Sequence, residues 1–250
     1  MKYLLIFLSL IFILDTNDFY YPDDVNYTKS QCDSIRDIGG RYYNVNKPLS
    51  QAELRKAADC YLENGYTKDA SYCFLNISTL YEEMGGKLDS AIIFSNLSLA
   101  VNLDSMHQAN IIKYLGYLHG QQGDYTLSAM YFNNAIKLYE VSDFEAGLNI
   151  TYFNMARVKF SQKDYESSQS YLDKSIEFWK SKSNNSRIFV NSILGVRIGI
   201  ETKNQALAKE YIDRNEHILT LEPDLPQSNI DTFFMYRNVY RDKFTQEKLD

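Results

Sequence analysis

The stretch ANIIKYLGYLHGQQGDYTLSAMYFNNAIKLYEVS, residues 109–142, has the pattern of two short amphipathic helices joined by a tight turn. Apolar residues recur at three- and four-residue steps on both sides of the turn, which places them on one face of each helix. Gly123 is suited to end the first helix, and Asp124 to cap the second by accepting from its free backbone N–H groups. The pattern therefore predicts a helical hairpin, in which the small residues Gly116 and Ser128 let the two helices approach closely.

This hairpin resembles the tetratricopeptide repeat family. The residues that match the family's spaced pattern of L-G, G-D-Y, A, F and A are Leu115-Gly116, Gly123-Asp124-Tyr125, Ser128, Phe132 and Ala135. The stretch departs from the pattern at Glu140, where the family usually has a proline, and at His119, where a tyrosine is common. The resemblance implies an all-α fold, a right-handed superhelical array (solenoid) of stacked antiparallel helix hairpins, of the bacterial exported type with repeats of about 40 residues.

Other segments copy the hairpin at a nearly constant period. The expected turns at Asp124, Asp164 and Asn204 are 40 residues apart, and a turn at Gly86 precedes Gly123 by 37. The helix pairs expected beside the first hairpin are 69–84 with 88–103, 145–162 with 165–180, and 186–202 with 205–221. Each hairpin is too thin to bury its own apolar faces, so the four units must stack.

Capping helices are expected at the two ends of a repeat region that covers residues 50–228. Ser50 and Glu53 have the form of a capping box that opens a helix over 50–64. A last helix within 229–250 carries its aromatic and basic residues on different stripes: Phe233, Tyr236, Tyr240 and Phe244 on one, and Arg237, Arg241 and Lys243 away from it. If the aromatic stripe is exposed, the helix is a self-association or docking face, and if it covers the last hairpin, the helix is a cap.

The N-terminal segment, residues 1–16, has the basic start and the apolar run of a secretory signal peptide. The apolar run over residues 3–14 is shorter than the roughly 20 residues that span a bilayer as a helix. Because residues 15–18 offer no small-x-small cleavage site, an uncleaved membrane anchor stays open as the alternative. The chain is expected to be exported to a periplasm, cell envelope or medium, and residues 17–49 to form a linker with one weak helix.

Composition and motifs argue against several classes of function. A formal net charge of -6 disfavours nucleic acid, whose phosphates reward a basic face. His107, His119 and His217 lack metal-ligand spacing, and no glycine-rich phosphate loop follows a strand. We therefore expect no enzyme, no metal and no cofactor.

Three cysteines leave two alternatives open. A bridge between Cys60 and Cys73 would join adjacent helices and leave Cys32 unpaired. Buried free thiols are the other interpretation.

The candidate binding residues come from the resemblance, which implies that the first helix of each hairpin lines a concave groove for an extended peptide or a partner's helix. The exposed groove positions on three successive repeats are Lys113, Tyr114 and Tyr117, then Phe153, Asn154 and Arg157, then Arg197. Tyr117, Arg157 and Arg197 form a ladder at 40-residue intervals. Two arginines in register suit a carboxylate, because the guanidinium fork donates paired hydrogen bonds. The alternative is that each arginine packs its stem between helices or pairs with a neighbouring acid.

Two hypotheses for function follow. The first is a non-enzymatic scaffold for protein–protein interaction, which binds a protein or peptide in the groove and touches a membrane only through an uncleaved N-terminal segment. The second is a sensory or regulatory module of a bacterial signalling system whose output domain is absent or encoded separately.

Overall fold

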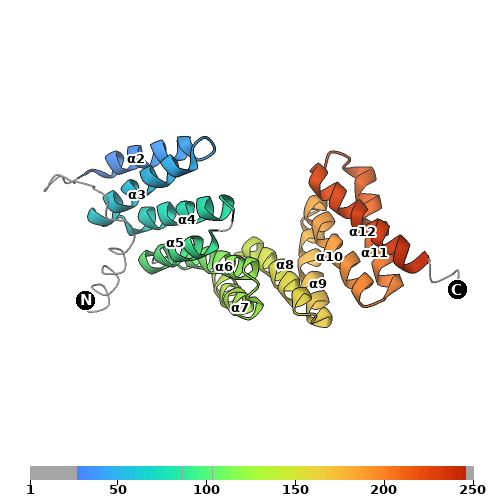
Figure 1. The fold of residues 1–250 in the computed structure, drawn as a ribbon. Coiled ribbons are helices and arrows are strands. Elements are labelled where there is room, and N and C mark those ends of the chain that lie inside the picture. Colours follow the sequence, from blue (N-terminus) through green and yellow to red (C-terminus); the bar gives the residue numbers. More distant parts are fainter. Residues whose placement is uncertain (1–26, 86, 103, 246–250) are drawn as a thin grey trace.

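The computed structural model describes residues 27–85, 87–102 and 104–245, and these residues form eleven helices and no strand. In chain order the helices are α2 (Lys29–Tyr42), α3 (Lys47–Glu63), α4 (Thr67–Glu83), α5 (Leu88–Val101), α6 (Ser105–Gln121), α7 (Tyr125–Ser142), α8 (Glu145–Ser161), α9 (Tyr165–Ser181), α10 (Asn185–Glu201), α11 (Gln205–Leu221) and α12 (Gln227–Thr245). Consecutive helices pair as hairpins that stack into an array, with α2 and α12 at opposite ends (Figure 1). None of these helices combines the length and apolar character that membrane crossing requires. The expected signal peptide or anchor, residues 1–16, lies outside the described residues.

The hairpin of α6 and α7 forms as the sequence predicts. Gly123 adopts a φ of 84°, and Asp124 caps α7 by accepting from the backbone N–H of Leu127 at 2.9 Å. The Ser128 hydroxyl donates to the Gly116 carbonyl at 2.6 Å, which ties the two helices together. A Cβ atom added to Gly116 would lie 2.9 Å from the ring of Phe132, so this close approach requires glycine.

The same turn recurs at the next two 40-residue steps. Asp164 accepts from the N–H of Ser167 at 3.2 Å, and Asn204 from that of Leu207 at 3.0 Å. The residue before each cap has the left-handed backbone of Gly123, although it is a lysine in both turns. The predicted turn positions are therefore confirmed, with helix ends within a few residues of those expected.

A fifth hairpin, α2 with α3, precedes the four that the sequence predicted. Residues 29–42, expected to be a weak helix in a linker, form α2, which opens with a capping box between Thr28 and Gln31. Gly39 lies against Leu54 of α3, where an added Cβ would be 2.8 Å from the Leu54 Cγ. Gly39 therefore lets α2 and α3 pack closely, whereas a Cβ added to Gly40 would meet nothing within 4 Å.

Helix α3 begins earlier than predicted and is not a capping helix. Asn46 caps it by accepting from the N–H of Leu49 at 3.1 Å, and Pro48 lies in its first turn. Ser50 is buried and donates to the carbonyl of Gly39 at 2.8 Å, so the predicted capping box over residues 50–53 is wrong. Because α2 covers α3, the latter is the second helix of a hairpin.

The disulfide joins Cys32 to Cys60, with the two Cα atoms 5.6 Å apart. The bridge considered from the sequence, Cys60 to Cys73, is therefore wrong. Pairing of α2 with α3 brings Cys32 beside Cys60, whereas Cys73 on α4 is free and buried in the same apolar cluster. Burial raises the pKa of the Cys73 thiol to about 12.

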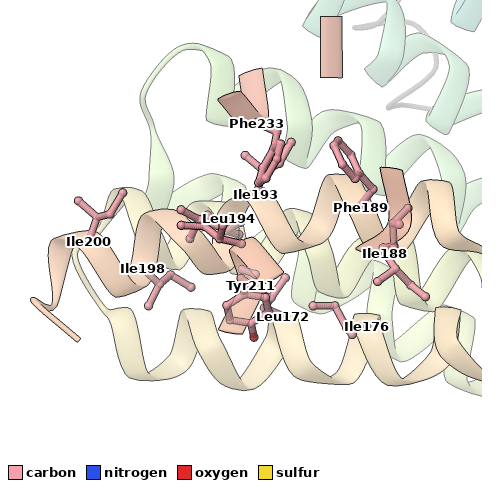
Figure 2. Close-up of a cluster of buried hydrophobic side chains, with 14 of the residues drawn as sticks. Leu172, Ile176, Ile188, Phe189, Ile193, Leu194, Ile198, Ile200, Tyr211 and Phe233 are labelled. Carbon is pink, nitrogen blue, oxygen red and sulfur yellow. The ribbon is translucent and has the colours of Figure 1, made fainter. Parts of the chain in front are cut away.

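Helix α12 covers the last hairpin with its aromatic stripe. Phe233 is fully buried beside Phe189 and Ile193 of α10 (Figure 2), and Phe244 is 6% exposed. The stripe is thus a cap contact, which removes the basis for self-association through it.

Two of the basic residues of α12 also contact the array. Arg237 forms an ion pair with Glu216 of α11 at 2.8 Å, and Lys243 donates to the carbonyl of Ile200 at 3.0 Å. Both cations therefore help to fasten the cap.

Candidate functional site

The first helices of successive hairpins form one continuous surface, here called the first-helix face. Tyr43, at the end of α2, is hydrogen-bonded to Thr79 of α4 at 2.9 Å. Tyr117 of α6 donates to the Glu82 carboxylate of α4 at 3.1 Å. Helices α6 and α8, and then α8 and α10, also contact one another. This face contains the positions from which the resemblance implies binding.

A cavity of about 80 Å³ opens between α6, α7 and α8. Small residues at Gly116, Gly120 and Ser128 leave this space. Its polar rim comes from two first helices and consists of Tyr117, Gln121, Asn154, Arg157 and Ser161. Three of the predicted residues, Tyr117, Asn154 and Arg157, therefore meet at one cavity.

Tyr117 is held in place from both sides. Its hydroxyl donates to Glu82 and accepts from the Gln121 side chain at 2.7 Å, while its ring stacks on Tyr114 with centroids 5.9 Å apart. Burial is the main cause that raises the pKa of Tyr117, and Glu82 adds to it. Burial likewise raises the pKa of Tyr114. Both phenols stay neutral at physiological pH and present fixed rings beside the cavity.

Arg157 is exposed on the rim of the cavity and forms no ion pair with any acid in the described part of the chain. Asn154 lies three residues earlier on α8, and Ser161 lies four residues later, so all three project from one helix face. The rim thus offers a guanidinium, two amides and two hydroxyls at one mouth. These groups are suited to hold an anionic or amide-bearing group.

Arg197, the third member of the predicted ladder, does not reach this cavity. Its guanidinium lies between two rings, 4.4 Å from the centroid of Phe160 on α8 and 5.1 Å from that of Tyr236 on α12. Phe153 packs against the C-terminal core instead of lining the cavity. For Arg197 the geometry favours the alternative interpretation, a cation packed between helices.

Lys113 lies one turn before Tyr117 and is half-buried without an acidic partner in the described residues. Its Nζ donates to the Asn110 side chain at 3.4 Å and lies 5.8 Å from the centroid of the Tyr139 ring. Burial lowers the pKa of Lys113, and the positive charge of Arg187 on α10 lowers it further. A second basic position therefore exists on the same face.

Sequence reasoning missed Gln121 and Ser161, which lie on the rim of the cavity. They follow Tyr117 and Arg157 by four residues, so the helical period alone could have placed them on the same stripe.

The described residues contain no group of three His, Cys, Asp or Glu side chains arranged to hold a metal ion. The ring of His107 is tilted by 47° from that of Tyr72, with centroids 4.1 Å apart, whereas the ring of His119 stacks on that of Tyr131 with centroids 5.2 Å apart. Burial lowers the pKa of both histidines. Each histidine ring therefore packs against a tyrosine ring, and the His119 side chain is also hydrogen-bonded to Gln122.

Comparison with known proteins identifies both a repeat and the fold. A tetratricopeptide repeat family model matches residues 151–178, which span most of α8 and α9. The apo form of RapI superposes with a TM-score of 0.75 at 13% identity, covering 86% of this chain and 60% of RapI.

Two further structures share the fold. A putative kinesin light chain with TPR-like repeats from Podosopora anserina gives 0.64 at 10% identity, covering 79% of this chain and 99% of the other. A Rap protein complexed with competence and sporulation factor gives 0.59 at 14% identity, covering 90% of this chain and 65% of that protein. No curated protein sequence matches the chain significantly. At these identities the structural likeness establishes the fold alone.

Proposed function

From the premise that this chain is a tetratricopeptide repeat protein, we propose that it is a non-enzymatic interaction scaffold that binds a segment of a protein or peptide on the first-helix face. The cavity between α6 and α8 is the anchor point of that segment. The partner places a carboxylate against Arg157, within reach of the amides of Asn154 and Gln121. Tetratricopeptide repeat proteins are generally scaffolds without catalytic activity, and the residues at this cavity suit binding rather than a reaction.

The observation that carries the proposal is an exposed arginine, without an acidic partner, above a preformed cavity. Arg157 belongs to a protein with 32 acidic residues, yet none in the described part forms an ion pair with it. An exposed guanidinium is free to donate two parallel hydrogen bonds to one carboxylate.

The size of the cavity indicates the kind of ligand. A space of about 80 Å³ is well below the 300–1,000 Å³ typical of pockets that enclose whole small molecules. It accommodates a single side-chain head group. The rest of the ligand must then lie along the first-helix face, which suits an extended peptide segment.

Structural relatives support a ligand-binding role. One Rap protein of this fold was solved as a complex with competence and sporulation factor, so the architecture accommodates a bound partner. The likeness also supports the second candidate, a sensory or regulatory module, in which binding on this face changes how the array contacts an output protein. Arg197 provides a physical link for that alternative, since it joins α8, which carries the site, to α12.

We also propose that the protein is exported. The basic start and apolar run of residues 1–16 support this, and so does the Cys32–Cys60 disulfide, because such bonds persist mainly in oxidising compartments. Fractionation of cells that express the full chain tests it, and recovery of all the protein in the cytoplasm with free thiols at both positions contradicts it.

A photo-crosslinking experiment tests the proposed site. A benzoylphenylalanine replaces Ser161 at the cavity rim, and in a matched control it replaces Lys137, an exposed residue of the second helix α7. We expect a partner to be crosslinked from position 161 and not from 137, and the additional change Arg157→Gln to abolish the crosslink. Equal crosslinking from both positions, or a partner retained despite Arg157→Gln, contradicts the proposal.

A further inference from the structure

A second cavity, of about 650 Å³, lies between the second helices α9 and α11. It shares no lining residue with the cavity at Arg157. Its volume falls within the roughly 300–1,000 Å³ of pockets that enclose a whole small molecule. The apolar side chains of Ile176 and Leu207 line it together with Tyr211. The charged residues of its lining are Asp173, Glu177, Lys180, Glu210 and Arg214.

A hydrogen-bonded network between the two helices forms one wall of this cavity. The amide of Gln169 donates to the Asp173 carboxylate at 2.7 Å and to the Tyr211 hydroxyl at 2.6 Å, and that hydroxyl donates to Asp173 at 3.1 Å. Both donors reach the same oxygen, Oδ1, so the Oδ2 atom of Asp173 has no hydrogen-bond partner among the described residues. The Gln169 oxygen Oε1 also has none there. The wall thus contains two acceptor atoms that lack a donor.

The acids that line this cavity outnumber the cations. Glu210 and Arg214 form an ion pair at 2.7 Å, which cancels their charges. Asp173 and Glu177 form no ion pair with a cation of the described residues, and Lys180 is the remaining cation of the lining. The two acids are four residues apart on α9, so they project from one helix face about 6 Å apart along the axis. Two carboxylates at that spacing therefore stand beside the cavity without a partner.

The preceding repeat shows that the hairpin itself does not require these acids. Forty residues before Asp173 and Glu177, on α7, the chain has Asn133 and Lys137. A neutral residue and a basic residue thus serve at the corresponding positions of a helix with the same place in its hairpin. Packing alone does not account for the two carboxylates, whereas a positively charged ligand does.

We propose that the cavity between α9 and α11 binds a pair of alkylammonium groups, one held by Asp173 and the other by Glu177. Hydrogen bonds between ammonium and carboxylate groups are charge-assisted, and an ammonium N–H also suits the orphan oxygen of Gln169. The spacing of the acids fits two amines joined by a short alkyl chain, whose methylene groups contact Ile176 and Leu207. The volume of the cavity favours a free aliphatic diamine or polyamine, and two lysine side chains of a protein offer the same chemistry.

Isothermal titration calorimetry of the full chain with spermidine tests this site. The titration is done at physiological ionic strength, which screens attraction to the net charge of the whole molecule. We expect one spermidine per chain, and binding of butylamine, which has a single ammonium group, at least tenfold weaker. Asp173→Asn/Glu177→Gln should weaken spermidine binding at least tenfold. The matched control Glu140→Gln/Asp143→Asn removes the same charge at the C-terminal end of α7 and should bind as wild type does.

A short peptide with two lysines separated by one glycine identifies the source of the ammonium groups. Binding of the peptide but not of spermidine, with the same loss in Asp173→Asn/Glu177→Gln, supports the ammonium site and assigns the ligand to a protein. Binding of neither probe refutes the proposal, and so does an equal loss in the two double variants. Butylamine that binds as tightly as spermidine refutes the pairing of the two acids. Circular dichroism confirms that each variant folds.

This inference does not depend on the proposed peptide site. The two cavities share no residue, so the crosslink from position 161 should be unaffected by Asp173→Asn/Glu177→Gln. Failure of spermidine and the lysine peptide to bind would therefore leave the peptide site standing, and failure of the crosslinking experiment would leave the ammonium site standing.

Discussion

Removal of the Cys32–Cys60 disulfide by a double change to alanine should destabilise one end of the array selectively. The bond joins residues 28 positions apart. In the chain-entropy treatment, closing a loop of about that length lowers the entropy of the unfolded chain by about 12 cal/mol/K, which corresponds to about 3.6 kcal/mol at 25 °C. Stacked repeats contact only their neighbours, so the loss should fall on α2 and α3 rather than on the whole molecule.

Hydrogen exchange followed by mass spectrometry measures this effect helix by helix. A loss of about 3.6 kcal/mol should increase local opening of α2 by roughly 400-fold, since each 1.4 kcal/mol is a factor of ten. Peptides from α10, at the other end, should exchange as in wild type. Cys73→Ala, which leaves the bond intact, is the matched control. Unchanged exchange in α2, or an increase spread equally over α10, would refute both the entropy argument and the independence of the ends.

Three further predictions concern packing and charge. Gly199→Ala should lower the free energy of unfolding by about 1–3 kcal/mol, because the added Cβ would lie 2.5 Å from the backbone nitrogen of Ala208. Gly40→Ala, whose added Cβ meets nothing within 4 Å, should raise the free energy of unfolding by about 0.5–1 kcal/mol. Thermal unfolding measures both changes. Equal shifts for the two would contradict the packing argument. Phe233→Ala should cost about 3–5 kcal/mol and expose α12 to proteolysis ahead of α6, and uniform cleavage would count against its role as a cap. Lys113→Gln should be more stable than wild type at pH 7. Burial lowers the pKa of Lys113 in the folded protein, so the charged side chain reduces stability at pH values below that pKa. The loss disappears as the pH rises toward the ordinary lysine value of 10.5. A difference in stability between variant and wild type that is constant with pH would contradict this.

The repeat pattern was sufficient to predict most of the fold. Three signals recur every 40 residues: a residue that ends a helix, an Asp or Asn that caps the next helix, and a small residue four positions after the cap. Each of them can be recognised from a short stretch of a single sequence. The first hairpin was missed because Gly39-Gly40 looks like a break when only propensity is considered. The close contact between Gly39 and Leu54 depends on the neighbouring helix α3, which propensity does not take into account. The disulfide pairing was missed for the same reason.

The candidate site was only partly predictable. The cavity brings together Tyr117, Asn154 and Arg157 because adjacent first helices repeat in register. The 40-residue period of the sequence is enough to predict that register. Arg197 stacks on Tyr236, a residue of the terminal helix that lies outside the period.

The turns within the later hairpins suggest how the molecule could be rebuilt. Each of these turns has one residue with a left-handed backbone between the end of a helix and the capping side chain, namely Gly123, Lys163 or Lys203. The capping residues that follow, Asp124, Asp164 and Asn204, are 40 positions apart. Two of these three positions are lysines in a backbone conformation that favours glycine, so the joint itself does not depend on one residue type. A 40-residue cassette cut at these joints, residues 124–163, could then be duplicated or excised without redesigning a loop. An array with one more cassette would have a longer first-helix face.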